Sequence, residues 1–210
     1  CCSIGAAHWI HAIRYNMNMT VLLHDNHIYG LTKKQASPTS PIGTKSNTTP
    51  RGSYLDALSP LTVTLGVQNV SFVAQAVDWI PESLFQVLTA AYRHRGFSFV
   101  RILQRCPEFV GNMFEPWVHD PQRMLMLTHA DGIRVSPALQ KIYRNQLPHD
   151  PADINREIAS SDDPIPVGIL YRNPEVPCYE DLRGAGKLRT ADQVRGALDG
   201  ELDKFTVWPQ

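Results

Sequence analysis

Apolar positions in the first part of the chain follow helical and strand periods. Five apolar side chains recur about every three and a half residues at its start: Ile4, Ala7, Trp9, Ile10 and Ile13. This spacing predicts a helix over residues 3–16, with Ser3 as its N-cap. A short β-rich run at 19–23 ends in the polar residues 24–26, which predicts a buried parallel strand followed by a turn.

The same periods continue to residue 103. Ser59 and Pro60 suit the N-cap and first position of a short helix. The further predicted elements are a strand at 70–74, a helix at 81–95 ended by Gly96, and a strand at 97–103. Such alternation is typical of an α/β domain with a mostly parallel sheet, in which ligands gather outside the carboxyl ends of the strands. Asn26 and Cys106 follow two such ends.

Two stretches lack a regular period. Residues 27–60 are rich in Thr, Ser, Pro and Gly, and a loop of this length is typically functional or disordered. After about residue 107 the pattern predicts only a helix near 136–145 and a short apolar run at 166–171. We therefore interpret residues 112–210 as an irregular extension that wraps the core or a partner.

The composition limits the class of protein. The 210 residues include 20 Lys and Arg against 20 Asp and Glu, so general nucleic-acid binding is not expected. No apolar run reaches the roughly 18 residues that a membrane span needs. The four cysteines have no spacing typical of a secreted framework, which favours a soluble protein of the reducing cytoplasm. Because the chain lacks an initiator Met and starts directly in a helix, we suspect a missing upstream segment.

The turn at Asp25 and Asn26 is the first candidate for chemistry. A side-chain oxygen and a backbone carbonyl at this turn can bind one Mg²⁺, which prefers oxygen ligands and shares them with a phosphate. From composition alone, however, Asp-Asn at a strand end is more often simple turn chemistry. His8 and His11 have a spacing that zinc can use, but no third ligand is placed nearby, and helix packing is the favoured interpretation.

Several motifs agree in order and spacing with one enzyme family. They are residues 3–5, His8, 10–12, Arg14, Asn16, 25–26, 28–33, Gln35 and 37–39. In these motifs the chain resembles the thiamine-diphosphate half of the β subunit of 2-oxoacid:ferredoxin oxidoreductases, from residue 1 to about 111. The run at 168–173 is similar to the end of the 2-oxoglutarate-type subunit.

This resemblance implies a thiamine-diphosphate-binding fold, with a mostly parallel sheet flanked by helices and an irregular C-terminal tail. Residues 1–111 would be the C-terminal portion of a thiamine-diphosphate and magnesium-binding domain, and 112–210 an extension on the core or the partner subunit. In the family, a Gly-Asp-Gly-Asp segment stands directly before the position of Cys1 and supplies an aspartate to the magnesium. The sequence given does not contain it.

The resemblance also assigns cofactor residues. Asn26 would supply its side-chain oxygen and Ile28 its carbonyl to Mg²⁺, while Gly30 and Leu31 would border the diphosphate and the thiazolium. His27, between the two metal ligands, is interpreted as a packing residue, as is Tyr29.

Lys33 resembles the family lysine beside the reactive carbon, where an ammonium can bind the carboxylate of a 2-oxoacid. A solvated loop lysine is the alternative. The Gly-Leu-Thr-Lys form of this segment favours 2-oxoglutarate or a broad range of 2-oxoacids. Lys34 stands where the family often has Gly, which leaves the local backbone shape open.

Cys106 resembles the last of four cysteines that hold a 4Fe-4S cluster in the family's β subunit, the other three lying upstream. Without the resemblance, a lone Cys after a strand is more often a small buried hydrophobe. Cys1, Cys2 and Cys178 are interpreted as structural.

The function implied is oxidative decarboxylation of a 2-oxoacid, with 2-oxoglutarate favoured, to acyl-coenzyme A and CO₂, or the reverse carboxylation. Electrons would pass through the 4Fe-4S cluster to ferredoxin. The implied partner is an α subunit, in a dimer of αβ heterodimers. Two alternatives stay open: a cluster-free thiamine-diphosphate decarboxylase or synthase, which has no use for Cys106, and a non-catalytic interaction module.

Overall fold

A computed structural model describes residues 2–130, 133–184 and 190–205. The helices are α1 (Ala6–Arg14), α2 (Pro60–Leu65), α3 (Pro81–Arg93), α4 (Glu115–His119), α5 (Pro137–Ile142), α6 (Arg156–Ser160), α7 (Tyr179–Leu182) and α8 (Ala191–Asp203), with a 3₁₀ turn at Pro121–Arg123. The strands are β1 (Met19–Asp25), β2 (Ile28–Tyr29), β3 (Gln35–Ala36), β4 (Phe72–Val77), β5 (Phe97–Leu103), β6 (Met124–Thr128), β7 (Gln146–Pro148) and β8 (Ile165–Arg172).

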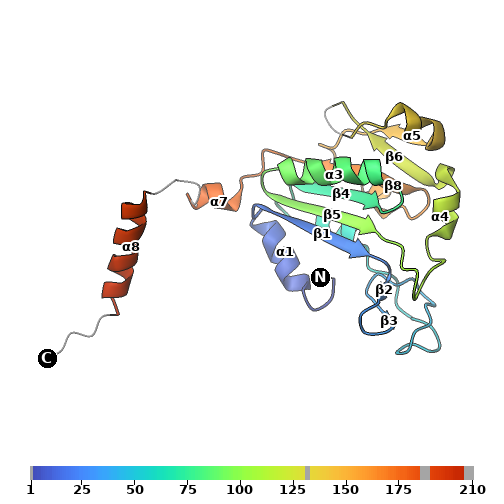
Figure 1. Ribbon diagram of the computed structural model, residues 1–210, viewed down its shortest axis with the longest axis horizontal. Coiled ribbons are helices and arrows are strands. Elements are labelled where there is room, and N and C mark those ends of the chain that lie inside the picture. The colour runs from blue at the N-terminus through green and yellow to red at the C-terminus, as the bar shows by residue number, and fades with distance from the viewer. Residues whose placement is uncertain (1, 131–132, 185–189, 206–210) are drawn as a thin grey trace. The chain divides into compact units, whose positions relative to one another are not determined.

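One six-stranded sheet, in the order β1-β5-β4-β8-β6-β7, organises the first compact unit, Cys1–Tyr179 (Figure 1). Strands β1, β5 and β4 are parallel to one another. β8 is antiparallel to β4, while β6 and β7 are parallel to β8. The sheet therefore consists of two sets of parallel strands that run in opposite directions. The carboxyl ends of one set lie beside the amino ends of the other set. The prediction of a mostly parallel α/β sheet is confirmed.

Helices cover both faces of this sheet, with α3 and α1 on opposite sides (Figure 1). Val87 and Ala91 of α3 lie in one cluster with Val100 of β5. On the other face, Trp9 of α1 stacks on Phe99 of β5 at 5.3 Å between ring centroids. Apolar side chains of α2 and α6 join that second cluster. Because both faces are covered, β4 and β5 are buried along their whole length.

The predicted strand at 97–103 and the Ser59 N-cap are confirmed, since the Ser59 side chain accepts a hydrogen bond from Thr62 N. Two local predictions are wrong. Helix α1 begins at Ala6 after Gly5, and the Ser3 hydroxyl instead lies 2.7 Å from the Tyr29 hydroxyl. Strand β1 is not buried but largely exposed, because it is one of the two edge strands of the sheet and has a neighbour on one side only.

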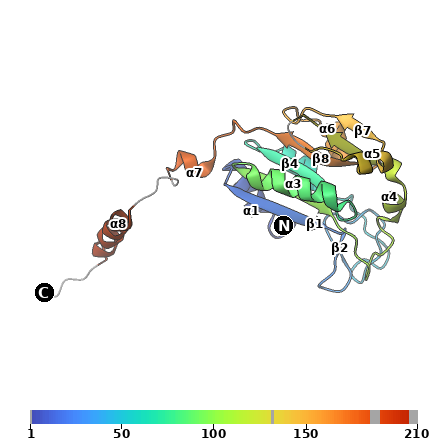
Figure 2. The same ribbon diagram turned by 45° about the horizontal axis from the view of Figure 1, so that its top comes forward.

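The division expected at residue 111 does not coincide with the structural units. Strands β6, β7 and β8 continue the same sheet beyond β4 (Figure 2), and the boundary between the two compact units falls after Tyr179 in the sequence. The physical reason is apolar burial: Met124 and Val167 are fully buried in a core cluster with Val77 of β4. Residues 124–172 are thus part of the core, and the expectation of an irregular extension is wrong for them.

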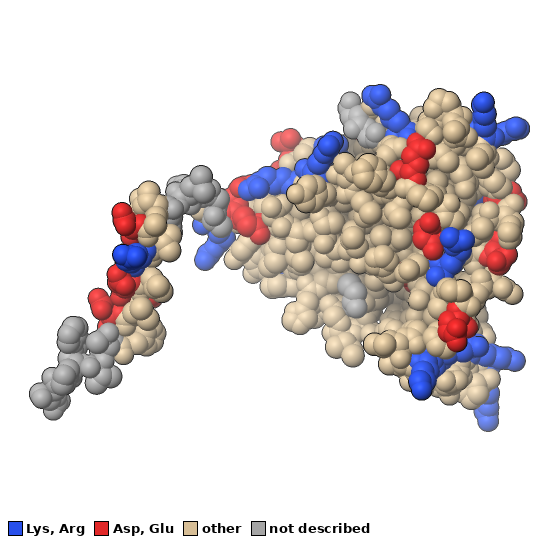
Figure 3. Space-filling view, viewed as in Figure 1, with Lys and Arg blue, Asp and Glu red and all other residues tan. Residues whose placement is uncertain are grey.

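The surface carries charges of both signs. On the face shown in Figure 3, basic and acidic side chains are interspersed among uncharged ones, in line with the balanced composition. Among the residues that the structure describes, no helix combines the length and apolar character that crossing a membrane requires.

Candidate functional site

The turn after β1 brings the two predicted magnesium ligands together. Asn26 Oδ1 accepts a hydrogen bond from Ile28 N at 3.2 Å, and His27 between them has a positive φ of 59°. Asn26 and Ile28 line one cavity of about 190 Å³. The other residues that line it are Cys2, Leu23, His24, Asp25, Tyr29, Ser37, Pro38 and Thr39. The end of β1 and the loop at 37–39 therefore form a single small cavity around Asn26.

The buried carboxylate of Asp25 holds this turn in place through hydrogen bonds. Asp25 Oδ1 accepts hydrogen bonds from Thr39 Oγ1 at 2.6 Å and from His27 N at 3.1 Å. Asp25 Oδ2 accepts from Arg101 Nε at 2.8 Å and lies 2.7 Å from Arg101 Nη2. Asp25 thus ties the end of β1, the following loop and strand β5 to one another.

The electrostatics of Asp25 follow from these contacts. Burial by itself raises the pKa of this carboxyl, but the charge of Arg101, the neighbouring His27 and the hydrogen bonds from Thr39 and Arg101 outweigh burial. The pKa of Asp25 therefore lies below its ordinary value, and the group is a carboxylate at neutral pH. Each Asp25 oxygen already has two protein donors within 3.1 Å, whereas Asn26 Oδ1 accepts one hydrogen bond, so Asn26 rather than Asp25 is suited to bind an ion.

The polar contacts continue across the sheet. Arg101 Nη1 donates to Gln75 Oε1 at 3.3 Å, and Gln75 Nε2 donates to the carbonyl of Pro166 at 2.8 Å. A buried chain of side chains therefore joins the four neighbouring strands β1, β5, β4 and β8. We call Asp25, Arg101 and Gln75 the Asp25 network.

His27 belongs to the same region, although we interpreted it from the sequence as a packing residue. Its Nε2 lies 3.2 Å from Arg101 Nη2, and because a guanidinium can only donate, Nε2 must accept. Burial, and then the charge of Arg101, lower the pKa of His27 against the opposing effect of Asp25, so the ring is neutral with its proton on Nδ1. The ring also packs edge-on against Phe114 at 5.1 Å.

The donor set at the turn fits a magnesium ion that obtains its remaining ligands elsewhere. Asn26 Oδ1 accepts one hydrogen bond and keeps a second lone pair, and Ile28 contributes a backbone carbonyl. Both are neutral oxygens of the kind Mg²⁺ takes together with a phosphate and water. Within the described residues no group of three or more His, Cys, Asp or Glu side chains could hold a metal by itself.

The other predicted cofactor residues lie in the next turn, outside the lining of this cavity. Leu31 is 99% exposed and Lys33 is exposed, so both are available to a large ligand or a partner. Asn47 Nδ2 donates to the Lys33 carbonyl at 2.7 Å and holds the turn. Lys34 has a φ of 64°, so this lysine keeps the left-handed backbone that glycine would adopt most easily. A Cβ on Gly30 would be in ordinary contact with Phe109.

Cys106 lies half-buried in the loop after β5, and its carbonyl accepts a hydrogen bond from Val110 N at 3.3 Å. No cluster-binding group is assembled around it by the described residues. Its role as a cluster ligand therefore remains a prediction. Cys2, which we interpreted as structural, lines the Asn26 cavity, and burial is the main cause that raises the pKa of its thiol.

Neither Arg101 nor Gln75 was predicted from the sequence to belong to this site. The available signal was a charged and an amide side chain within mainly apolar strands that are buried along their length. Such a residue in a buried strand needs a partner. The pattern gave no means of choosing Asp25, which is 76 positions away from Arg101.

Comparison with known proteins defines the class first. Residues 1–102 match the family described as thiamine pyrophosphate enzyme, C-terminal TPP binding domain. This half of the chain, which contains the Asn26 turn, is therefore a thiamine-diphosphate-enzyme domain, as predicted from the motifs.

Two similar proteins of known name are subunits of 2-oxoacid oxidoreductases. The 2-oxoglutarate oxidoreductase subunit KorB of Mycobacterium tuberculosis is 42% identical over 133 residues, which cover 62% of this chain and 35% of that protein. The β subunit of a 2-oxoacid:ferredoxin oxidoreductase from a Sulfolobus species is 33% identical over 185 residues, covering 85% and 56% respectively. The chain is a homologue of the β subunits of 2-oxoacid:ferredoxin oxidoreductases, and it spans between about a third and just over half of these two curated relatives.

A solved structure agrees with this assignment. The 2-oxoglutarate:ferredoxin oxidoreductase of Magnetococcus marinus, determined with 2-oxoglutarate, coenzyme A and succinyl-CoA bound, matches with a TM-score of 0.67 and 29% identity. The match covers 93% of this chain and 63% of that one. Coverage of this extent cannot be confined to residues 1–111, so it reaches into the part of the chain that contains β6 to β8.

Proposed function

We propose that this chain is the thiamine-diphosphate-binding part of the β subunit of a cytoplasmic 2-oxoacid:ferredoxin oxidoreductase. The enzyme would convert a 2-oxoacid, with 2-oxoglutarate favoured, and coenzyme A to an acyl-CoA and CO₂, or run in reverse. The observation that carries the proposal is the Asn26–Ile28 turn, with both predicted ligands lining one cavity in a segment that matches thiamine enzymes. The names of the relatives supply the substrate class.

Each residue of the turn has a distinct task in this proposal. Asn26 and Ile28 would hold Mg²⁺, and Gly30 and Leu31 would border the diphosphate and thiazolium of thiamine diphosphate. When bound, this coenzyme supplies the electron sink that loss of CO₂ from a 2-oxoacid requires. Lys33, exposed on the next turn, binds the substrate carboxylate as a point charge.

The Asp25 network keeps the turn in place for this chemistry. Asp25 accepts hydrogen bonds from His27 N and from the Thr39 hydroxyl, and Arg101 fixes Asp25 to strand β5. Preorganised ligands bind a metal without the cost of ordering the loop. Cys106 would complete a 4Fe-4S cluster with cysteines outside this sequence, and an α subunit and ferredoxin would complete the enzyme as a dimer of αβ heterodimers.

The proposal is tested with intact β and α subunits, 2-oxoglutarate, coenzyme A and a viologen dye. We expect dye reduction that needs both thiamine diphosphate and Mg²⁺ and that falls strongly in Asn26→Ala. Asn112→Ala, an exposed asparagine outside the Asn26 cavity, is the matched control and should keep full activity. Absence of dye reduction with every 2-oxoacid tried would reject the function.

A cluster-free thiamine enzyme is the second candidate, because the matched family describes thiamine enzymes in general and such an enzyme would share the Asn26 turn without needing Cys106. The two candidates differ in iron content. Iron analysis of the intact β subunit, with Cys106→Ser as the comparison, separates them: a cluster enzyme contains iron that the variant loses. A non-catalytic module would instead give no heat with thiamine diphosphate and Mg²⁺ in calorimetry.

A further inference from the structure

A second cavity, which has no part in the proposed function, lies at the carboxyl ends of β6, β7 and β8. Strands β8, β6 and β7 run in the direction opposite to β4, β5 and β1. Their carboxyl ends therefore lie at the opposite end of the strands from the Asn26 turn, which follows the carboxyl end of β1. All three ends line a cavity of about 880 Å³. Its lining includes Thr128 and His129 from β6 and its end, Pro148 and His149 from β7, and Arg172 of β8. Open α/β sheets bind ligands at such carboxyl ends.

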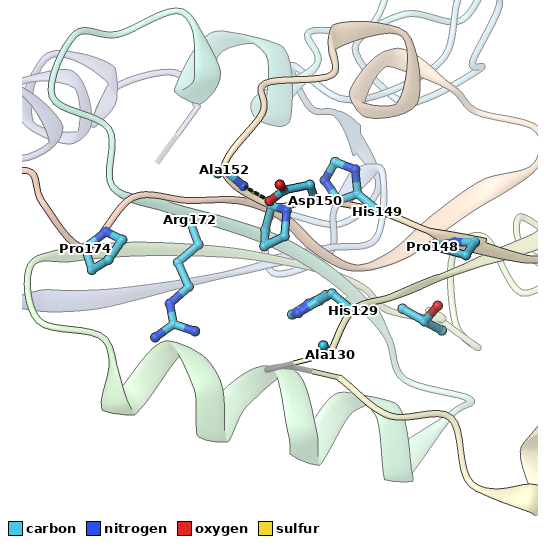
Figure 4. Close-up of a pocket in the computed structure, with 10 residues that line it drawn as sticks. His129, Ala130, Pro148, His149, Asp150, Ala152, Arg172 and Pro174 are labelled. Carbon is cyan, nitrogen blue, oxygen red and sulfur yellow. Dashed lines mark hydrogen bonds between the residues drawn. The ribbon is translucent and has the colours of Figure 1, made fainter.

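Arg172 is the main cation of this cavity. Its side chain extends from the end of β8 toward α3 in Figure 4, and it also lines a neighbouring cavity of about 310 Å³ with Arg93 and His94 of the α3 end. Arg172 is half-buried and makes no ion pair with a described carboxylate. We call Arg172, Arg93 and the two cavities the Arg172 corner.

Few acidic side chains line the Arg172 corner among the residues that the structure describes. Among the described residues that line the two cavities, Asp150 carries the acidic group, and its Oδ1 already accepts a hydrogen bond from Ala152 N at 2.9 Å. His94 is buried, with Nε2 2.9 Å from Ser71 Oγ, and burial followed by the charge of Arg172 lowers its pKa to about 4. A neutral histidine and a second arginine beside Arg172 leave the local charge positive.

We propose that the Arg172 corner binds an anionic small molecule through a carboxylate or phosphate group. The planar guanidinium of Arg172 presents two parallel donors that match either group, and Arg93 adds a second positive charge. The larger cavity has the volume typical of small-ligand sites. This site is separate from the Asn26 turn and does not depend on the proposed function.

Calorimetry with two probes tests the proposal and identifies the group. Intact β and α subunits are first saturated with thiamine diphosphate and Mg²⁺, so that the diphosphate site is filled. Pyrophosphate and succinate are then titrated separately at up to millimolar concentrations. We expect at least one of them to bind at one site per chain, and the better probe tells whether a phosphate or a carboxylate is preferred.

The variants assign the site. Arg172→Gln should weaken binding at least about tenfold, as expected for loss of a charge-assisted contact, and Arg93→Gln should weaken it less. Arg172→Lys keeps the positive charge but loses the two parallel donors of the guanidinium, so it should retain part of the affinity. Partial binding by this variant would show that the loss in Arg172→Gln is a binding defect and not a folding defect. Arg156→Gln, an exposed arginine outside both cavities, is the control and should bind as the wild type does. Absence of heat with both probes, or unchanged binding by Arg172→Gln, overturns the proposal.

Discussion

Arg101→Met removes the cation that compensates the buried carboxylate of Asp25. The two side chains are 10% and 3% exposed, and Asp25 Oδ2 lies 2.8 Å from Nε and 2.7 Å from Nη2. Methionine leaves Asp25 with its contacts to Thr39 and His27 but without a counter-charge. Loss of one partner of a buried pair costs about 3–5 kcal/mol of unfolding free energy.

Denaturant unfolding of the intact β subunit measures this cost. A loss of this size corresponds to a fall in Tm of about 6–20 °C for a unit of this length. Arg105→Met is the matched control, because Arg105 pairs with Asp78 at 2.9 Å but its side chain is 48% exposed. An exposed pair of this kind contributes about 0–1 kcal/mol. Equal costs for the two variants would refute the account of the Asp25 network.

The pH dependence provides a second check. In the wild type the pKa of Asp25 is below its ordinary value, so its contribution is complete above the unfolded-state pKa of about 4 and is lost as the pH falls further. In Arg101→Met, burial is no longer opposed by Arg101, and Asp25 binds a proton more readily. We expect the difference between variant and wild type to shrink in acid. A difference that does not change with pH would contradict this reasoning.

The same variant connects stability with binding. Because Asp25 positions the Asn26 turn, folded Arg101→Met should bind Mg²⁺ with thiamine diphosphate about 10- to 100-fold more weakly, the usual effect of removing a group that orients a metal ligand. Calorimetry at a temperature where the variant is fully folded measures this, and unchanged affinity would show that the network serves stability alone.

Three further predictions concern single positions. Lys34→Gly relieves a left-handed φ of 64° and should stabilise the chain by about 0.5–1 kcal/mol in denaturant unfolding. His94 has a pKa of about 4 in the folded chain against about 6.5 in the unfolded chain, so the neutral ring's contribution to the free energy of unfolding is fully present above pH 6.5. This contribution falls by up to about 3 kcal/mol as the pH drops to 4, and His94→Gln should make the free energy of unfolding less dependent on pH in that range. Ser59→Ala removes the N-cap of α2 and should cost about 1 kcal/mol, with a thermal melt as the measurement.

The sequence predicted those parts of the fold that depend on local patterns. The strand at 97–103 and the helix that begins at Pro81 follow directly from apolar periods, and a polar N-cap beside proline located α2. Non-local pairing was not predictable in the same way. β8 pairs with β4, where Arg172 lies opposite Phe72, a hundred positions earlier in the chain. Short apolar runs such as 166–171 do not reveal which strand they will join.

The candidate site shows the same limit. A motif placed Asn26 and Ile28 at one turn, because ligands that lie two residues apart need no long-range information. The exposure of β1 could not be foreseen, since it depends on how many neighbours a strand has in the sheet. Nor could the partner of Asp25, since many charged side chains could have filled that position.

A crystal structure of the intact β subunit with thiamine diphosphate and Mn²⁺ in place of Mg²⁺, with the metal located by anomalous scattering, would show whether the Asn26 turn binds the ion. We expect an anomalous peak about 2.0–2.2 Å from both Asn26 Oδ1 and the Ile28 carbonyl oxygen, next to the diphosphate. A metal bound elsewhere, or these two oxygens turned away from one another in the loaded protein, would contradict it.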